Sequence, residues 1–186
     1  MITFSVFTYI AWFSSEFLLN RFLRSNSTDL RNKDQSSLLY IWITITVSIA
    51  LGVYISSHSN FPISMDLWIE GFGLAMIWLG VVLRLLVIRT LGPYFTVDVT
   101  IRENHRLKTD GFYKHLRHPS YTASLISFAG FGLALNNWLS FVVVFLPVLF
   151  VFVIRIRIEE QVLIEKFGSE YLDFQKSTNA LIPFIY

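Results

Sequence analysis

Long apolar segments alternate with shorter polar connections along this chain of 186 residues. A helix needs about 20 mainly apolar residues to cross the hydrocarbon core of a bilayer. Five segments reach or approach that length, which predicts five membrane-spanning helices, at residues 2–19, 38–56, 67–88, 121–135 and 139–154. The last two segments are short, and only Asn136 and Asn137 separate them. This spacing predicts either a tight turn between antiparallel helices or a helical hairpin.

Lysine and arginine are concentrated in every second connection. The connections after the first and third apolar segments and the C-terminal tail carry them, whereas the second and fourth connections carry none. Basic loops stay preferentially on the cytoplasmic side of a membrane. The pattern therefore predicts a multi-pass integral membrane protein whose N-terminus lies outside and whose C-terminus and polar segments lie in the cytoplasm.

The cytoplasmic part is predicted to be ordered. The connection at residues 90–117 is long for a simple link, and long loops in compact proteins are functional or disordered. Its many aromatic and aliphatic residues favour an ordered, packed loop. After the last span, apolar residues recur near 3.6-residue spacing, which predicts an amphipathic helix over residues 155–177. We see no linker or repeat, so residues 1–186 are predicted to form a single all-α membrane domain.

Composition supports the membrane assignment and excludes several kinds of functional site. Hydrophobic residues make up 54% of the chain and charged residues 15%, whereas a soluble domain carries about 25% charged residues. There is no cysteine, which excludes disulfides, thiolate metal sites and cysteine nucleophiles. The net charge of +2 comes from basic residues beside apolar segments. Contact with anionic membrane lipids explains them better than binding to nucleic acid.

The most informative polar segment is GFYKHLRHPSY, at residues 111–121. Proline favours the first turn of a helix and forces the preceding residue toward extended geometry, so a helix is predicted to begin at Pro119. Free backbone N–H groups at such a helix start favour an anion, and Arg117 and His118 lie beside them. Tyr121, one turn further in, can stack on a flat ring or donate its hydroxyl. A capped membrane helix with interfacial polar residues would explain the same pattern.

A second polar cluster follows the last apolar segment. Arg155 and Glu159 are four residues apart, so they share a helix face and can pair, while Glu160 points about 100° away. Ionisable residues at the end of a span are costly to bury without partners, which makes them candidates for a functional site. The alternative is an interfacial charge network, which we favour for Arg157. Arg84, near the end of the third span, can extend to the interface or line the site, and we favour the former.

A metal site is not expected. His105, His115 and His118 lie in or beside the long loop and could join the two glutamates of the second cluster. However, Pro119 makes a regular helix through His115 and His118 unfavourable, and the whole chain has 4 histidines.

Two glycine pairs fall within apolar runs rather than after strands. Gly71 and Gly73, and likewise Gly130 and Gly132, lack the third glycine of a dinucleotide-binding loop. They predict close helix packing through small residues.

Taken together, the polar blocks resemble those of the isoprenylcysteine carboxyl methyltransferase family of integral membrane enzymes. The matching residues are Leu91-Gly92, Phe95-Thr96, Ile101, His105-x-Leu107, Gly111-x-Tyr113, Arg117-His118-Pro119-Ser120-Tyr121, Arg155, Glu159-Glu160, Leu163, Phe167-Gly168, Tyr171 and Leu181-Ile182-Pro183. The resemblance divides the chain into a three-span anchor region, residues 1–90, and a cofactor-binding catalytic core, residues 91–186. Ala123 and Asn104 stand where the family often has glycine.

The resemblance implies methyl transfer from S-adenosylmethionine to a lipophilic acceptor that enters from the bilayer. The acceptor that the resemblance implies is the C-terminal carboxylate of an isoprenylated cysteine. The implied cofactor-binding residues are Leu107, Lys108, Gly111, Tyr113, His118, Pro119, Tyr121, Glu159 and Glu160. The implied catalytic residues are Arg117 and Glu160, and Arg117 and Arg155 are the implied contacts to the acceptor. No metal is implied.

The sequence is also compatible with three other functions. A related membrane methyltransferase acting on a phospholipid amine or a small thiol would use the same cofactor and depend less on Arg117. An NADPH-dependent sterol-type reductase would share a distantly similar C-terminal motif, although such enzymes are much longer. A non-catalytic membrane scaffold would bind no adenosyl ligand and would tolerate alanine at His118 and Glu160.

Overall fold

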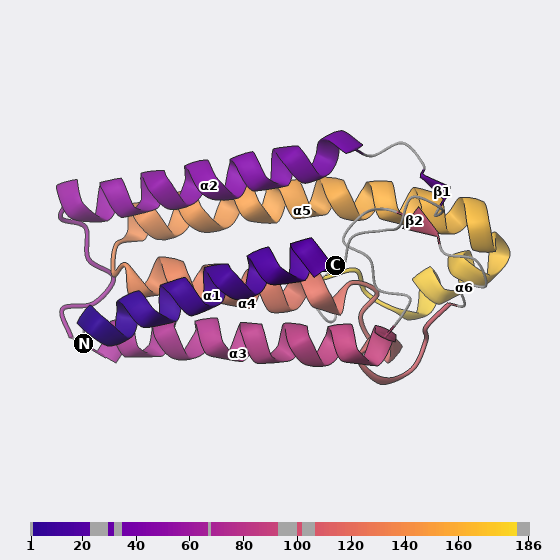
Figure 1. Cartoon of the computed structure of the whole chain (residues 1–186), viewed down its shortest axis with the longest axis horizontal. Helices are drawn as coiled ribbons and strands as arrows, with labels where there is room; N and C mark the ends of the chain where they lie inside the picture. The colour runs from indigo at the N-terminus through magenta and orange to yellow at the C-terminus, as the bar shows by residue number, and fades with distance from the viewer. Residues whose placement is uncertain are drawn as a thin grey trace.

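Five long helices lie along one axis and form a bundle, and shorter elements gather at one end (Figure 1). The computed structural model describes residues 2–22, 30–31, 35–66, 68–92, 100–101 and 107–181. The long helices are α1 (Ile2–Phe22), α2 (Gln35–His58), α3 (Trp68–Leu91), α4 (Pro119–Ala134) and α5 (Trp138–Phe167). The shorter elements are β1 (Leu30–Arg31), β2 (Thr100–Ile101), the 3₁₀ helix η2 (Gly111–Lys114) and α6 (Ser169–Ser177).

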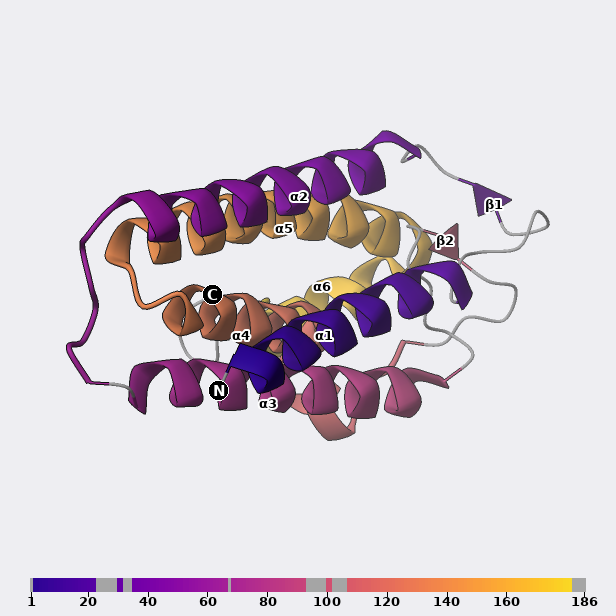
Figure 2. The same ribbon diagram turned by 60° about the vertical axis from the view of Figure 1, so that its left-hand side comes forward.

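The helices pack in pairs. Helix α2 lies beside α5, α3 lies beside α4, and α1 crosses the bundle against α3 (Figure 2). Helices α4 and α5 join the two pairs. The main core lies between them and contains Trp12, Ile77, Phe128, Val148 and Ile156.

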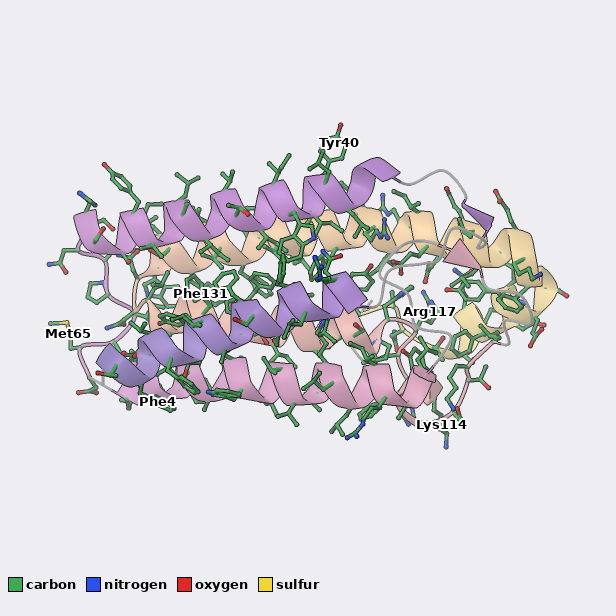
Figure 3. All side chains as sticks on the ribbon, in the orientation of Figure 1. Phe4, Tyr40, Met65, Lys114, Arg117 and Phe131 are labelled. Carbon is green, nitrogen blue, oxygen red and sulfur yellow. The ribbon has the colours of Figure 1, made fainter. Side chains whose placement is uncertain are left out.

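The bundle presents apolar side chains outward. Phe4, Tyr40 and Met65 project away from the helices and their connections (Figure 3), and Met65 is 91% exposed. Among the described residues, three helices are long and apolar enough to cross a membrane, namely α2, α3 and α5. The predicted all-helical membrane architecture is therefore confirmed in its coarse form. Helix α4 has 16 residues, fewer than the roughly 20 needed for a full crossing, and the count of five spans stays a prediction.

The connections fall at two opposite ends, as their charges predict. Strands β1 and β2 pair antiparallel, with Leu30 opposite Ile101, and so join the first and third connections. At the other end, the Asn136 side chain accepts hydrogen bonds from the backbone N–H groups of Ile63 and Ser64, at 3.1 and 3.0 Å. These bonds join the second connection to the fourth. The side of the membrane on which each end lies stays a prediction.

Two predicted boundaries are confirmed. Helix α4 begins at Pro119, with His118 in the preceding, non-helical position. Asn136 and Asn137 form the turn to α5: Asn136 has a φ of 48°, and the Asn137 side chain accepts a hydrogen bond from the Ser140 N–H. Asparagine tolerates this left-handed conformation better than most residues do.

The C-terminal helix differs from the prediction. Helix α5 continues from the apolar segment to Phe167 without a break, and α6 is a separate helix of 9 residues. No glycine or proline lies between Ile154 and Phe167, so nothing ends the helix there. Gly168 ends it, with a φ of 57° that favours glycine. The predicted end near Ser177 is confirmed. The motif residue His105 and the motif pairs Phe95-Thr96 and Ile182-Pro183 lie outside the described residues.

Glycines allow α3 and α4 to approach closely. A Cβ on Gly73 would lie 2.5 Å from the Gly130 carbonyl oxygen, and a Cβ on Gly130 would lie 2.6 Å from the Gly73 carbonyl oxygen. Gly132 faces Phe141 of α5 in the same way, at 3.0 Å, whereas Gly71 faces open space. Close packing is thus confirmed for three of these four glycines.

The pair Gly73 and Gly71 provides a matched test of this packing. Gly73→Ala is expected to destabilise the protein by about 2–3 kcal/mol, because the new methyl group would force α3 and α4 apart. Gly71→Ala is expected to be neutral or stabilising by up to about 1 kcal/mol, since alanine favours a helix and nothing opposes it. Thermal unfolding in detergent measures both changes. Equal unfolding midpoints for the two variants would contradict the close approach.

Candidate active site

The Arg-His-Pro segment is held in place by the end of the chain. Leu116 pairs with Asn179 in a parallel bridge. The Arg117 N–H donates to the Asn179 carbonyl at 2.8 Å, and the His118 N–H donates to the Ala180 carbonyl at 3.1 Å. These bonds fix the backbone immediately before α4. They direct the side chains of the segment toward the last two turns of α5.

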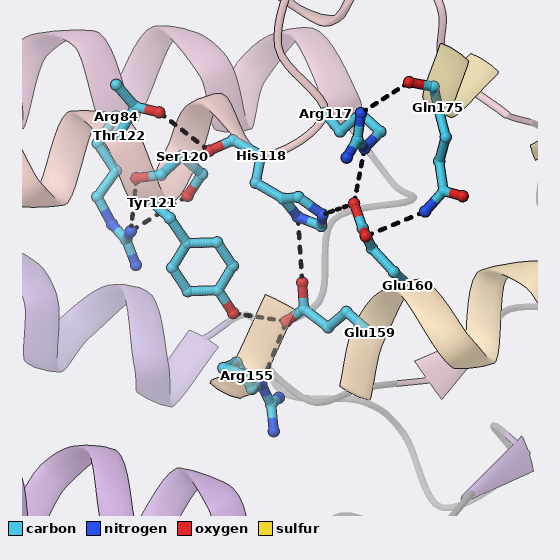
Figure 4. A network of polar contacts seen from close by, with 10 residues as sticks. All are labelled: Arg84, Arg117, His118, Ser120, Tyr121, Thr122, Arg155, Glu159, Glu160 and Gln175. Atoms are coloured by element: carbon cyan, nitrogen blue, oxygen red, sulfur yellow. Dashed lines mark hydrogen bonds and ion pairs between the residues drawn. The ribbon is translucent and has the colours of Figure 1, made fainter. Parts of the chain in front are cut away.

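The His118 imidazole lies between two consecutive glutamates of α5 (Figure 4). Its Nε2 lies 3.2 Å from Glu160 Oε1, and its Nδ1 lies 3.5 Å from Glu159 Oε2. The side chain is 7% exposed. Both ring nitrogens can donate only when the ring is protonated. Burial alone would lower the pKa of His118, but the hydrogen bonds to Glu159 and Glu160 and their charges outweigh it and raise this pKa above its ordinary value.

Glu159 is bound by two further donors. The Tyr121 hydroxyl donates to Glu159 Oε1 at 2.5 Å, and Arg155 Nε donates to the same oxygen at 3.2 Å. The pairing of Arg155 with Glu159 that the sequence predicts is thus confirmed. Arg155 is 1% exposed, so this ion pair is buried and depends on its hydrogen bonds for compensation.

Glu160 connects the network to α6. Arg117 Nε donates to Glu160 Oε1 at 2.6 Å, and the Gln175 side-chain amide donates to Glu160 Oε2 at 3.0 Å. Arg117 Nη1 also donates to the backbone carbonyls of Gln175 and Thr178, at the end of α6. A cation at the C-terminal end of a helix is favourable, because the last carbonyls carry partial negative charge. Neither Gln175 nor Thr178 was predicted, because Gln175 resembles the other polar residues of the predicted helix and Thr178 follows its end.

Arg117 therefore does not have its whole guanidinium free for an acceptor. Its Nε and Nη1 bind protein groups, and only Nη2 makes no hydrogen bond to the described residues. A contact to an acceptor through Nη2 is compatible with this arrangement. A two-pronged clamp would require the bond to Glu160 or to α6 to open.

The structure brings together most of the predicted site residues. One network of hydrogen bonds and ion pairs contains Arg117, His118, Tyr121, Arg155, Glu159 and Glu160. Pro119 begins α4 directly after His118. Tyr113 lies in a second apolar cluster beside the network, with Val87, Tyr171 and Phe174. Burial and the charge of Glu159 raise the pKa of Tyr113.

Three predicted cofactor residues lie apart from the glutamates. Lys108 pairs with Asp110 at the surface, at 2.8 Å, and Gly111 begins η2 with a φ of 59°. No hydrogen bond or ion pair of the described residues joins Lys108 or Gly111 to Glu159 or Glu160. Leu107 lines an open hollow of about 630 Å³ between this segment and α6. The other described residues lining it are Thr109, Lys114, His115, Glu170, Asp173, Phe174, Ser177 and Thr178.

The described residues contain no group of three or more histidine, aspartate or glutamate side chains arranged to hold a metal ion. His118 and the two glutamates are close together, but each ring nitrogen faces a different carboxylate. Those carboxylates also accept hydrogen bonds from Arg117, Tyr121 and Arg155. The network is a chain of ion pairs rather than a set of converging ligands.

The raised pKa of His118 makes stability depend on pH. The stabilisation from the protonated ring is fully present below the ordinary pKa of 6.5 and is lost as the pH rises through the raised value of the folded protein. From about pH 6 to about pH 9, the unfolding midpoint is expected to fall more in the wild type than in His118→Gln. His115→Gln, at an exposed position, is expected to keep the wild-type profile. Parallel profiles for the wild type and His118→Gln would contradict this account.

Residues 73–165, which contain both polar blocks, match the sequence profile of the isoprenylcysteine carboxyl methyltransferase (ICMT) family. Protein-S-isoprenylcysteine O-methyltransferase B of Arabidopsis thaliana is 38% identical over 135 residues, which cover 71% of this chain and 68% of that protein. A probable protein-S-isoprenylcysteine O-methyltransferase of Oryza sativa subsp. indica is 33% identical over 159 residues, which cover 83% of each chain.

The fold of this chain is also similar to that of a solved structure. A solved structure of the eukaryotic intramembrane Ras methyltransferase ICMT superposes with a TM-score of 0.64 and 26% sequence identity. The match covers 97% of this chain and 68% of the other.

Proposed function

Because this chain belongs to the isoprenylcysteine carboxyl methyltransferase family, we propose that it transfers a methyl group to the C-terminal carboxylate of an isoprenylated cysteine. It is an integral membrane protein with several apolar helices. The observation that carries the proposal is the network of Arg117, His118, Glu159 and Glu160. All four residues fall inside the segment that matches the family.

The proposed methyl donor is S-adenosylmethionine, which when bound supplies an activated methyl group on a sulfonium. The two glutamates provide acceptors suited to its ammonium and ribose hydroxyl groups, and Tyr121 provides an aromatic ring beside them. Tyr171 adds a buried hydroxyl beside Glu160. These groups fit the cofactor chemically. We assign its binding to His118, Pro119, Tyr121, Glu159 and Glu160, with Leu107, Lys108, Gly111 and Tyr113 from the preceding segment.

The charges of the network favour an anionic acceptor. When His118 is protonated, three cationic side chains face two carboxylates, because Arg117 and Arg155 accompany the imidazolium. An ionised carboxylate is already a competent nucleophile, so its methylation needs positioning and desolvation more than a general base. A cationic amine would instead add to the excess positive charge. This argument favours the carboxylate over the phospholipid amine as the acceptor.

We place the active site and the C-terminus on the cytoplasmic side and the N-terminus outside. The support is the distribution of lysine and arginine, since the connections that carry them meet at the end of the bundle where the network lies. The water-soluble cofactor then approaches from the cytoplasm, and the lipophilic acceptor enters sideways from the bilayer.

The test is a transfer assay with matched acceptors. The purified protein in lipid nanodiscs receives tritiated methyl donor together with N-acetyl-S-farnesylcysteine, its carboxamide, phosphatidylethanolamine or a small thiol. The proposal predicts base-labile label on the free acid and none on the carboxamide, which differs only at the carboxyl group. Label on the amine or the thiol without ester formation would overturn the proposed acceptor.

A further inference from the structure

Arg84 is a charged side chain within α3 that reaches Ser120 of α4, beside the candidate active site (Figure 4). Its Nη1 donates to the Ser120 carbonyl and hydroxyl oxygens, both at 3.1 Å, and to the Ser124 hydroxyl at 2.5 Å. Its Nε lies 3.2 Å from Glu16 Oε1 of α1. The side chain is 14% exposed. The sequence predicts that Arg84 extends to the interface, whereas in the structure its side chain is largely buried against α4 and α1.

The atoms that Arg84 holds belong to the first two turns of α4. Ser120 follows Pro119 and directly precedes Tyr121, and Ser124 lies one turn further on the same face. A charged residue within a membrane span is costly unless it is paired. Here the guanidinium is compensated by Glu16 and by α4 itself, so the rotation of α4 that keeps both serines in reach is strongly favoured.

The contact between the two helices leaves little room for adjustment. Gly80 lies one turn before Arg84, and a Cβ there would lie 2.5 Å from the Ala123 carbonyl oxygen of α4. Ser127 of α4 also donates to the Ile77 carbonyl of α3 at 3.2 Å. Arg84 thus extends from a helix whose backbone is in direct contact with α4. Its hydrogen bonds therefore fix the start of α4 relative to α3.

We propose that Arg84 is a positioning residue for methyl transfer, which fixes the first turn of α4 so that His118 and Tyr121 meet Glu159 and Glu160. The role in methyl transfer rests on the proposed function. Arg84 makes no hydrogen bond or ion pair with either of these two glutamates among the described residues. It acts through Ser120 and Ser124. Residues Asn179 to Leu181 bind the backbone before α4 and the Thr122 hydroxyl, so they and Arg84 hold the start of α4 through different contacts.

The first test compares turnover in three variants. Arg84→Met is expected to lower kcat about 10-fold to 100-fold, with the KM for the acceptor within about threefold of wild type, because the acceptor itself is not contacted. Arg84→Lys keeps the charge and one donor direction and is expected to recover part of the loss. Arg89→Met changes an exposed arginine of the same helix and is expected to match wild type. Wild-type kcat in folded Arg84→Met would overturn the proposal.

The second test separates positioning from general destabilisation and does not require turnover. Titration of His118 by NMR of protein labelled with [¹⁵N]histidine reports whether the ring stays between the two glutamates, and His118→Gln assigns the signal. In Arg84→Met the apparent pKa of His118 is expected to fall, because the ring moves away from both carboxylates. An unchanged titration, with kcat lowered only as far as the unfolded fraction explains, would reduce Arg84 to a structural role. A shifted titration in a protein whose wild type methylates no carboxylate would retain the positioning and refute the proposed function.

Discussion

Glu160→Ala is expected to weaken the binding of S-adenosylhomocysteine about 10-fold to 150-fold. Glu160 accepts hydrogen bonds from Arg117 at 2.6 Å and from Gln175 at 3.0 Å, and it lies 3.2 Å from His118 Nε2. Its removal leaves Arg117 without its counter-ion, leaves His118 with Glu159 alone, and removes the side-chain contact of Gln175 that links α6 to α5. In the proposed site Glu160 also binds the cofactor directly, and losing a hydrogen bond to a charged group costs about 1.5–3 kcal/mol, which corresponds to roughly 10-fold to 150-fold in affinity.

Calorimetry on detergent-purified protein measures this change directly. Glu165→Ala is the matched control, since Glu165 lies on the same helix but is exposed, and it is expected to bind like wild type. Glu160→Gln keeps the shape of the side chain and tests whether the charge is required. A folded Glu160→Ala protein with undiminished affinity would show that Glu160 does not belong to the cofactor site.

Arg117→Lys is expected to lower turnover about 30-fold while the affinity for S-adenosylhomocysteine changes less than about fivefold. Arginine binds Glu160 through Nε and the carbonyls at the end of α6 through Nη1. Lysine offers a single charged nitrogen and cannot reproduce this fork. Losing a hydrogen bond to a charged group costs about 1.5–3 kcal/mol, and 2 kcal/mol corresponds to roughly 30-fold in rate.

The measurement is a steady-state assay that separates kcat from the KM values for donor and acceptor. Arg157→Lys provides the control, because Arg157 is exposed on α5 close to the network. A turnover equal to wild type in Arg117→Lys would remove Arg117 from the residues that matter for the reaction. A loss confined to cofactor affinity would make it a cofactor-binding residue instead.

Several features of the fold could be predicted from local patterns. The start of α4 at Pro119, the turn at Asn136 and Asn137 and the pairing of Arg155 with Glu159 each depend on residues that are close in sequence. The spacing of four residues on a helix and the restricted geometry of proline are sufficient to predict them. The meeting of His118 with Glu159 and Glu160 was different, because about forty residues separate the partners. It followed only from the resemblance to a family.

The features that were missed depend on tertiary packing. The sequence predicts a span at residues 139–154 and a helix at 155–177, but the apolar stripe does not show where one helix ends, and α5 ends at Gly168 instead. Arg84 was expected at the interface because the sequence does not show which neighbour faces it. Its partners Glu16, Ser120 and Ser124 lie on two other helices. The contribution of Gln175 and Thr178 likewise required the position of α6.

The central claim is that S-adenosylmethionine binds to residues 107–121 and to Glu159 and Glu160 of α5. Ultraviolet cross-linking of tritiated S-adenosylmethionine to the protein in nanodiscs, followed by mapping of the labelled fragments, tests this location directly. The account predicts label in fragments from residues 107–121 or 159–160, and loss of that label in Glu160→Ala but not in Glu165→Ala. Label confined to α1 or α2, or label unaffected by Glu160→Ala, would contradict it.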